Sequence, residues 1–116
     1  MANPDCLFCR IAAGEIPATI VHQDDLVVAF RDISPQAPTH ILLIPRRHLA
    51  SVGDVADGDG ELLARLMTTA TRLATDAGLD RSGYRLVTNT GPDAGQSVAH
   101  LHWHLLGGRP MAWPPG

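Results

Sequence analysis

A run of alternating histidines near the C-terminus is the feature that most restricts how this chain can fold. In residues 100–106, His-Leu-His-Trp-His-Leu-Leu, polar and apolar side chains alternate with the period of a β-strand. Side chains two residues apart in a strand share one face, with their Cα atoms about 6.5–7 Å apart. We therefore expect His100, His102 and His104 to line one surface, with the apolar residues between them facing the opposite way.

The remaining strands are predicted from β-rich runs that turn residues interrupt. Four such runs are expected as strands: residues 19–22, 26–31, 40–44 and 84–89. Pro35 and Pro38 mark a loop before the third of them, because each proline fixes φ and biases its predecessor towards extended geometry. The short connections favour antiparallel pairing.

Two helices complete the predicted fold. Residues 6–15 read as a short helix that Gly14 and Pro17 end. From Leu62 to Ala77, apolar residues repeat at helical spacing and give one apolar stripe. Asp57 or Asp59 can cap the start of this long helix, and Gly78 can supply a left-handed stop. The fold class is therefore predicted as α+β: a five-stranded antiparallel sheet with one long and one short helix.

Length and charge narrow the possible partners. At 116 residues, the chain is expected to form a single domain over residues 1–116. Nine basic against 12 acidic side chains argue against capture of a nucleic acid polymer, although a few local donors can hold one phosphate. No apolar run approaches the roughly 18 residues of a membrane span, and residues 1–6 lack a secretory pattern. A cytoplasmic location without membrane partners is expected.

Three explanations compete for the histidine row. A solvated strand face would show the same alternation, but would usually carry Thr, Lys, Glu or Ser. Imidazoles also bind zinc, but positions i, i+2 and i+4 of a flat strand converge poorly on one tetrahedral centre. Phosphoryl or nucleotidyl transfer fits better. One neutral imidazole can attack phosphorus while its neighbours stabilise the charge on the nonbridging oxygens.

The loop before the histidines supports phosphate chemistry. Gly91 and Gly95 permit backbone conformations in which N–H groups point at an anion. Ser97 adds a hydroxyl just before the histidine run, and Asn89 adds an amide at the end of the preceding strand.

Three sequence segments together resemble the histidine-triad (HIT) family. Residues 95–106, Gly-Gln-Ser-Val-Ala-His-Leu-His-Trp-His-Leu-Leu, look like its signature. Residues 32–40 and the ending from Gly107-Gly108-Arg109 to Trp-Pro-Pro-Gly are similar to its nucleotide-binding phosphoramidase branch. The resemblance implies a HIT-like fold and a homodimer that hydrolyses purine nucleoside 5′-phosphoramidates.

The resemblance also implies a role for individual residues. His102 matches the nucleophile that forms a nucleotidyl-histidine intermediate, and His40 and His100 complete the histidine cluster. Asp32 matches the carboxylate that binds the ribose diol. The phosphate contacts match His104, Ser97 and Asn89. The apolar base pocket matches Leu7, Phe8, Ile11, Phe30, Ile33 and Leu42. Trp113 resembles a tail residue that reaches the partner subunit's site.

Two features separate this chain from other branches of the superfamily. The transferases typically carry glutamine at the third histidine, where this chain has His104. The dinucleoside-polyphosphate hydrolases lack the Gly107-Gly108-Arg109 and Trp-Pro-Pro-Gly ending. Both differences favour the phosphoramidase branch, with dinucleoside-polyphosphate hydrolysis as an alternative.

Cys6 and Cys9 raise a separate question about metal. Their spacing is typical of half a zinc site, and His48 and His100 are candidates for the other two ligands. Some bacterial members of the family are similar here and bind zinc in this way. Otherwise the two cysteines would pack as small reduced hydrophobes. In the zinc interpretation, His100 orients the strand rather than contacting substrate, and the Zn²⁺ is structural because the hydrolysis itself needs no metal.

The sequence thus predicts a purine nucleoside phosphoramidase that acts through a covalent histidine intermediate. A nucleotide-binding or scaffolding protein with weak or vestigial catalysis would need the same pocket, so the sequence does not separate the two. A purely structural zinc module is a third interpretation, in which removal of zinc would unfold the chain.

Overall fold

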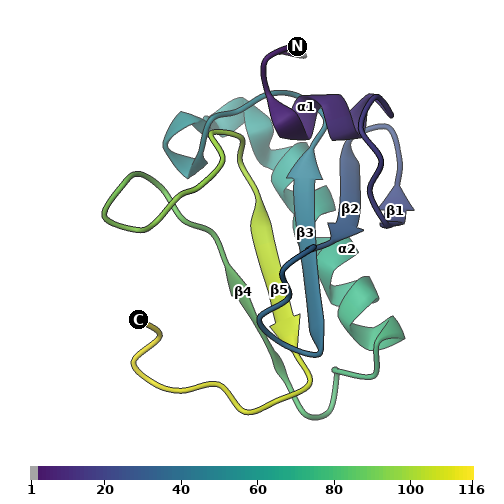
Figure 1. The fold of residues 1–116 in the computed structure, drawn as a ribbon, viewed down its shortest axis with the longest axis vertical. Helices are drawn as coiled ribbons and strands as arrows, with labels where there is room; N and C mark the ends of the chain where they lie inside the picture. The colour runs from purple at the N-terminus through teal and green to yellow at the C-terminus, as the bar shows by residue number, and fades with distance from the viewer. Residues whose placement is uncertain (1–2) are drawn as a thin grey trace.

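The computed structural model describes residues 3–116 and contains one antiparallel sheet with helices on both faces (Figure 1). The five strands follow the order β1-β2-β3-β5-β4, and every neighbouring pair is antiparallel. Their bounds are β1 Ile20–Gln23, β2 Val27–Arg31, β3 Thr39–Pro45, β4 Tyr84–Val87 and β5 Trp103–Gly107. The helices are α1 Leu7–Ala12 and α2 Gly60–Asp76, with the 3₁₀ turns η1 Val52–Asp54 and η2 Asp57–Asp59. The predicted fold class is confirmed.

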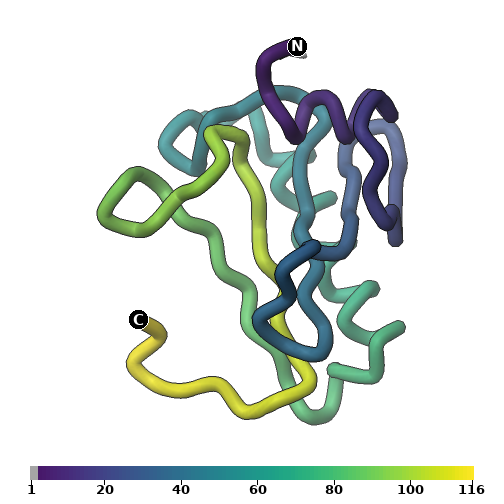
Figure 2. The backbone as a smooth tube through the Cα atoms, viewed as in Figure 1, coloured from purple at the N-terminus to yellow at the C-terminus, as the bar shows by residue number. Residues whose placement is uncertain are grey.

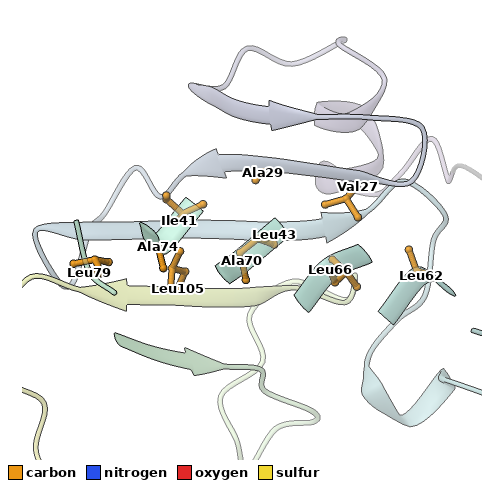
Figure 3. Close-up of a cluster of buried hydrophobic side chains, with 10 residues drawn as sticks. All are labelled: Val27, Ala29, Ile41, Leu43, Leu62, Leu66, Ala70, Ala74, Leu79 and Leu105. Carbon is orange, nitrogen blue, oxygen red and sulfur yellow. The ribbon is translucent and has the colours of Figure 1, made fainter. Parts of the chain in front are cut away.

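Helix α2 covers one face of the sheet through the predicted apolar stripe (Figure 3). Leu66, Ala70 and Ala74 are fully buried, and they pack in one cluster with Leu43 of β3 and Leu105 of β5. The helix follows Asp59 directly and is followed by Ala77 and Gly78, whose φ of 77° is the left-handed stop that the sequence predicts. Burial of this stripe holds the central strands β3 and β5 in place.

Helix α1 covers the other face near the N-terminal end of the chain. Phe8, Cys9 and Ile11 are buried there with Phe30 and Leu42 of the sheet. The helix is shorter than the predicted 6–15, because Gly14 takes a φ of 78° and the chain turns away towards β1. The sheet is therefore apolar on both faces, which explains why all residues of β2 except its last are buried.

The histidine strand starts later than its sequence pattern predicts. β5 begins at Trp103, so His100 and His102 precede the ladder. The backbone in that stretch bonds elsewhere: the Leu101 N–H donates to the Leu49 carbonyl, and the Thr88 hydroxyl donates to the His102 carbonyl. The predicted strand 84–89 likewise ends at Val87, which pairs with His104. At the start of β5 and at the end of β4, the backbone leaves the ladder and bonds instead to side chains and loop residues.

None of the helices in residues 3–116 is long and apolar enough to cross a membrane.

Candidate functional site

A cavity of about 390 Å³ lies between α1, the end of β2 and the histidine run. This is within the usual size range of small-ligand pockets. Its walls include all six residues of the expected base pocket, together with Asp32, Ser97, His102 and His104. The sequence reasoning missed the other lining residues, which are Ile16, Pro17, Ala18, Arg31 and Val98. Ile16, Pro17 and Ala18 enter the wall through the path of the chain after α1, Arg31 is the last residue of β2, and Val98 follows Ser97 in the loop before the histidines.

Four expected site residues lie outside this wall. His40 is buried directly behind it, and His100 is completely buried beside the cysteines. Asn89 is half-buried beyond β4 and does not line the cavity. Trp113 is 82% exposed in the C-terminal segment and does not line it either.

The apolar end of the cavity is formed around Phe8. Its ring meets Phe30 edge-on at a centroid distance of 5.4 Å and stands perpendicular to the His102 ring at 5.1 Å. Leu7 is 46% exposed and Ile33 is fully exposed, so these two form the rim rather than the floor. A flat apolar ligand could enter between the rim residues and reach the histidines.

Hydrogen bonding fixes the tautomer of His102. Its Nδ1 lies 2.7 Å from the His100 carbonyl oxygen, which can only accept, so Nδ1 carries the proton. In the neutral imidazole, Nε2 then keeps a free lone pair. His102 is buried in the protein but lines the cavity. It can therefore present an unprotonated nitrogen to a ligand there.

A second chain of hydrogen bonds fixes His104 in the opposite tautomer, with the proton on Nε2. The Gln36 backbone N–H donates to His40 Nδ1 at 3.0 Å, so the proton of neutral His40 lies on Nε2. This Nε2–H donates to His104 Nδ1 at 2.8 Å and also faces Asp32 at 3.5 Å. His104 must then carry its own proton on Nε2. The cavity thus contains one imidazole acceptor, on His102, beside one imidazole donor, on His104.

Burial keeps the two rings of this chain neutral. Burial, together with the nearby His102 and His40, lowers the pKa of His104 to about 4. Burial also lowers the pKa of His40, although the Asp32 carboxylate partly opposes that effect. Both rings are therefore neutral at pH 7, as the hydrogen-bond directions require.

The oxygen and nitrogen atoms of Asp32, His40 and His104 are close enough to suggest a metal site, but their hydrogen bonds argue against one. A metal on His40 Nε2 would place the proton of that ring on Nδ1, where it would face the Gln36 N–H. The three histidines of the run do not converge on one centre either, because His100 turns to the cysteines.

The cysteines and two histidines form a separate, tightly packed cluster. Cys6 Sγ and Cys9 Sγ lie 3.3 and 3.5 Å from His100 Nδ1, and Cys9 Sγ lies 3.4 Å from His48 Nδ1. The two Nδ1 atoms are 3.2 Å apart. Tetrahedral zinc with bonds of about 2.1 Å to nitrogen and 2.3 Å to sulfur would space its ligands by roughly 3.3–3.8 Å. The predicted ligand set therefore lies together, with nearly the spacing that a metal ion requires.

His100 has the correct tautomer for that cluster. Its Nε2 lies 2.9 Å from the Pro45 carbonyl oxygen, so the proton is on Nε2 and Nδ1 faces the sulfur atoms with a lone pair. Such a carbonyl partner commonly orients a metal-binding imidazole. The donor set of two sulfurs and two nitrogens fits zinc.

Gln96 organises the glycine loop before the histidines, a role that sequence reasoning missed. Its side-chain amide donates to the carbonyls of Ala50 and Val98 at 2.7 and 3.0 Å, and its oxygen accepts from the Gly91 N–H at 3.0 Å. These bonds close the loop and hold Ser97 at the cavity wall. The signal was present in the Gly-Gln-Ser motif of residues 95–97, where the glycine and the serine were assigned roles but the glutamine was not.

Comparison with known proteins identifies the family. The model of the HIT domain matches residues 13–111. The chain belongs to the HIT family. An Escherichia coli K12 protein named purine nucleoside phosphoramidase is 51% identical over 107 residues, which cover 92% of this chain and 90% of that protein. An uncharacterized HIT-like protein of Synechococcus elongatus is 52% identical and covers 98% of this chain and 99% of its own length.

Solved HIT structures have the same architecture. A HIT family hydrolase from Legionella pneumophila superposes with a TM-score of 0.95 at 58% identity, covering 97% of this chain and all of that one. The family and the HIT-like fold expected from the motifs are thereby confirmed.

The buried imidazoles predict a loss of stability in mild acid. Below about pH 6.5, the unfolded chain binds a proton at residue 104, whereas folded His104 stays neutral until about pH 4. The free energy of unfolding should therefore fall as the pH drops from 6.5 to 4. In His104→Gln this fall should be smaller by about 1–2 kcal/mol, after allowance for partial solvent exposure.

Urea denaturation at pH 7.5, 6 and 4.5 measures this difference, with each protein referred to its own value at pH 7.5. An identical pH dependence in the two proteins would contradict the assignment of a neutral, buried His104.

Proposed function

We propose that this HIT protein hydrolyses purine nucleoside 5′-phosphoramidates through a nucleotidyl intermediate on His102. The observation that carries the proposal is the fixed tautomer of His102, whose unprotonated Nε2 belongs to a ring that lines the cavity. The name of the Escherichia coli relative, a purine nucleoside phosphoramidase, supports the same substrate class.

In this proposal, the purine lies against the apolar wall around Phe8 and Phe30, and the ribose hydroxyls donate to Asp32 at the cavity wall. The α-phosphate lies beside the Nε2–H of His104 and the hydroxyl of Ser97. Both donors stabilise the negative charge that grows on the nonbridging oxygens as phosphorus is attacked. His40 supports this arrangement from behind, through its bond to His104.

The reaction has two displacement steps. His102 Nε2 forms a bond to the α-phosphorus while the P–N bond breaks, and the amine leaves after taking up a proton from solvent, which the attacking water of the second step returns. Water then attacks the same phosphorus, the bond to His102 breaks, and nucleoside 5′-monophosphate is released. No step in this sequence needs a metal.

Asn89 and Trp113 do not line the cavity within one chain. We propose that Trp113 acts in a dimer and that Asn89 acts when ligand binds. Trp113 is too exposed to serve the site of its own chain. An exposed indole of this kind fits a homodimer in which the tail reaches the partner's cavity. Asn89 follows the edge strand β4, where the glycine loop begins. If this loop closes on the phosphate, the side-chain amide of Asn89 would donate to a phosphate oxygen.

His102→Ala tests the proposed mechanism. With an adenosine 5′-phosphoramidate as substrate, wild-type protein should release the amine, and the variant should lose at least about 10³-fold in kcat because it has no nucleophile. His22→Ala, a change of the same chemistry on β1, is the matched control and should keep wild-type turnover.

A wild-type protein that binds adenosine monophosphate tightly but releases no amine would contradict the enzymatic proposal and favour a nucleotide-binding role. Faster turnover of a dinucleoside polyphosphate than of the phosphoramidate would instead indicate the other hydrolase branch.

We also propose that Cys6, Cys9, His48 and His100 bind a structural Zn²⁺ ion. The matching ligand spacing and the tautomer of His100 support this assignment. The ion would supply cross-linking between α1 and the start of the histidine run and would hold the carbonyl of His100 where His102 needs it.

Elemental analysis should find one zinc per chain in the wild type and none in Cys6→Ser/Cys9→Ser. Removing zinc with a chelator should lower the melting temperature of the wild type by about 10 °C, since a ligand present at 100 times its Kd stabilises by about 2.7 kcal/mol. The double variant is the control and should not respond to the chelator. A wild-type protein without zinc, or one whose melting is insensitive to chelation, would leave the cysteines as buried thiols.

A further inference from the structure

The Gly107-Gly108-Arg109 segment runs along the loop that joins β2 to β3. Figure 2 shows the C-terminal stretch leaving β5 beside this loop. Gly108 has a φ of 94°, and a Cβ atom there would lie 2.9 Å from Cβ of Pro38. Only glycine allows the chain to pass so close to Pro38 with that backbone conformation. The segment is therefore shaped to contact the loop.

Arg109 then fastens itself to the loop at one carbonyl. Its Nε and Nη2 donate to the carbonyl oxygen of Gln36 at 3.1 and 2.9 Å, and its Nη1 donates to the carbonyl of Pro110 at 3.0 Å. The planar guanidinium thus joins Pro110 to Gln36, which lies 73 positions before Arg109 in the chain. A charged donor makes both bonds to Gln36 stronger than ordinary amide hydrogen bonds.

Gln36 is also the first residue of the hydrogen-bond chain that sets the histidine tautomers. Its N–H donates to His40 Nδ1, and His40 Nε2–H donates to His104 Nδ1. Arg109 and His104 are consequently connected through two residues, Gln36 and His40, although Arg109 does not line the cavity. Any displacement of Gln36 would remove the donor that excludes a proton from His40 Nδ1.

We propose that Arg109 is a positioning residue for the reaction: it clamps the Gln36 carbonyl so that the Gln36 N–H fixes His40, and His40 in turn directs the Nε2–H of His104 to the phosphoryl group. The proposal rests on the proposed function for its kinetic part. Its structural part, the tautomer of His40, exists in the resting protein and needs no substrate.

Arginine is required at this position for geometric reasons. A planar fork can direct two N–H groups at one carbonyl oxygen while a third donor holds Pro110. Lysine has the same charge but its single ammonium group cannot reproduce this pattern. The comparison of Arg109→Lys with Arg109→Gln therefore separates the effect of geometry from that of charge.

The kinetic test uses purified full-length Arg109→Lys and Arg109→Gln with an adenosine 5′-phosphoramidate. Both variants should lose about tenfold in kcat, because His104 acts on the transition state, while KM should change by less than about twofold. Arg72→Gln, which removes an exposed arginine from α2, is the matched control and should keep both constants.

The decisive test measures the tautomer directly. In protein labelled with ¹⁵N-histidine, the two-bond couplings of each ring show which nitrogen carries the proton, and His40→Gln identifies the signals of residue 40. Wild type and Arg72→Gln should show His40 with the proton on Nε2. Both Arg109 variants should show a mixture of tautomers or a protonated ring at the same pH.

Two outcomes would overturn the proposal. One is an unchanged His40 tautomer in the Arg109 variants. The other is a fall in kcat without a change at His40, together with an altered oligomeric state in gel filtration or a large fall in melting temperature. This second outcome would assign Arg109 to assembly or to general stability.

The two proposals also fail separately. If wild-type protein releases no amine, the phosphoramidase proposal fails, and the tautomer measurement still decides the role of Arg109. Should Arg109→Gln not fold, Arg109→Lys carries the test, because it keeps the positive charge and nearly the same side-chain length.

Discussion

The hydrogen bond from His102 Nδ1 to the His100 carbonyl is the interaction on which the rest of the site depends. In the neutral ring it leaves the lone pair on Nε2 of His102, and it ties the ring to a backbone position that is itself held from two sides. The side chain of His100 is bonded to Pro45 and packed against the cysteines, and the next N–H, of Leu101, donates to Leu49. A bond of this kind inside the protein is strong only while its acceptor stays in place. The cysteine–histidine cluster provides that support.

Two opposite tautomers arise from the same residue type within one cavity. The Nδ1 atom of His102 donates to the His100 carbonyl, whereas the Nδ1 atom of His104 accepts from His40. Their free ring nitrogens therefore have opposite hydrogen-bonding character. Burial lowers the pKa of both His40 and His104 and keeps these two rings neutral, which avoids the repulsion that several imidazolium ions would create at this spacing.

The architecture could be predicted from the sequence because it follows from periodic burial, whereas most of the cavity wall was expected only from the resemblance to the HIT family. Alternation identified the face of His102 and His104, and helical spacing identified the stripe of α2. The pattern was wrong about where β5 begins, because alternation continues through His100 although the ladder does not. No local signal shows that the side chains of His100 and His102 bond to carbonyl oxygens while the backbone of both residues lies outside the ladder. The same holds for Gln36 and Arg109, whose contact joins two loops and has no periodic pattern.

The contact between Cys6 and His100 joins residues 94 positions apart. Helix α1 and its N-cap Cys6 supply both a wall of the cavity and two sulfur atoms, while the opposite wall comes from the start of β5 and the residues just before it. The cavity consequently cannot exist in a partly folded chain that has only one of these segments in place. Closing so long a loop costs more conformational entropy than forming the hairpins and α2, so we expect its contacts to form late in folding. A ligand or ion that binds there would select the completed fold, and its binding would report that folding has finished.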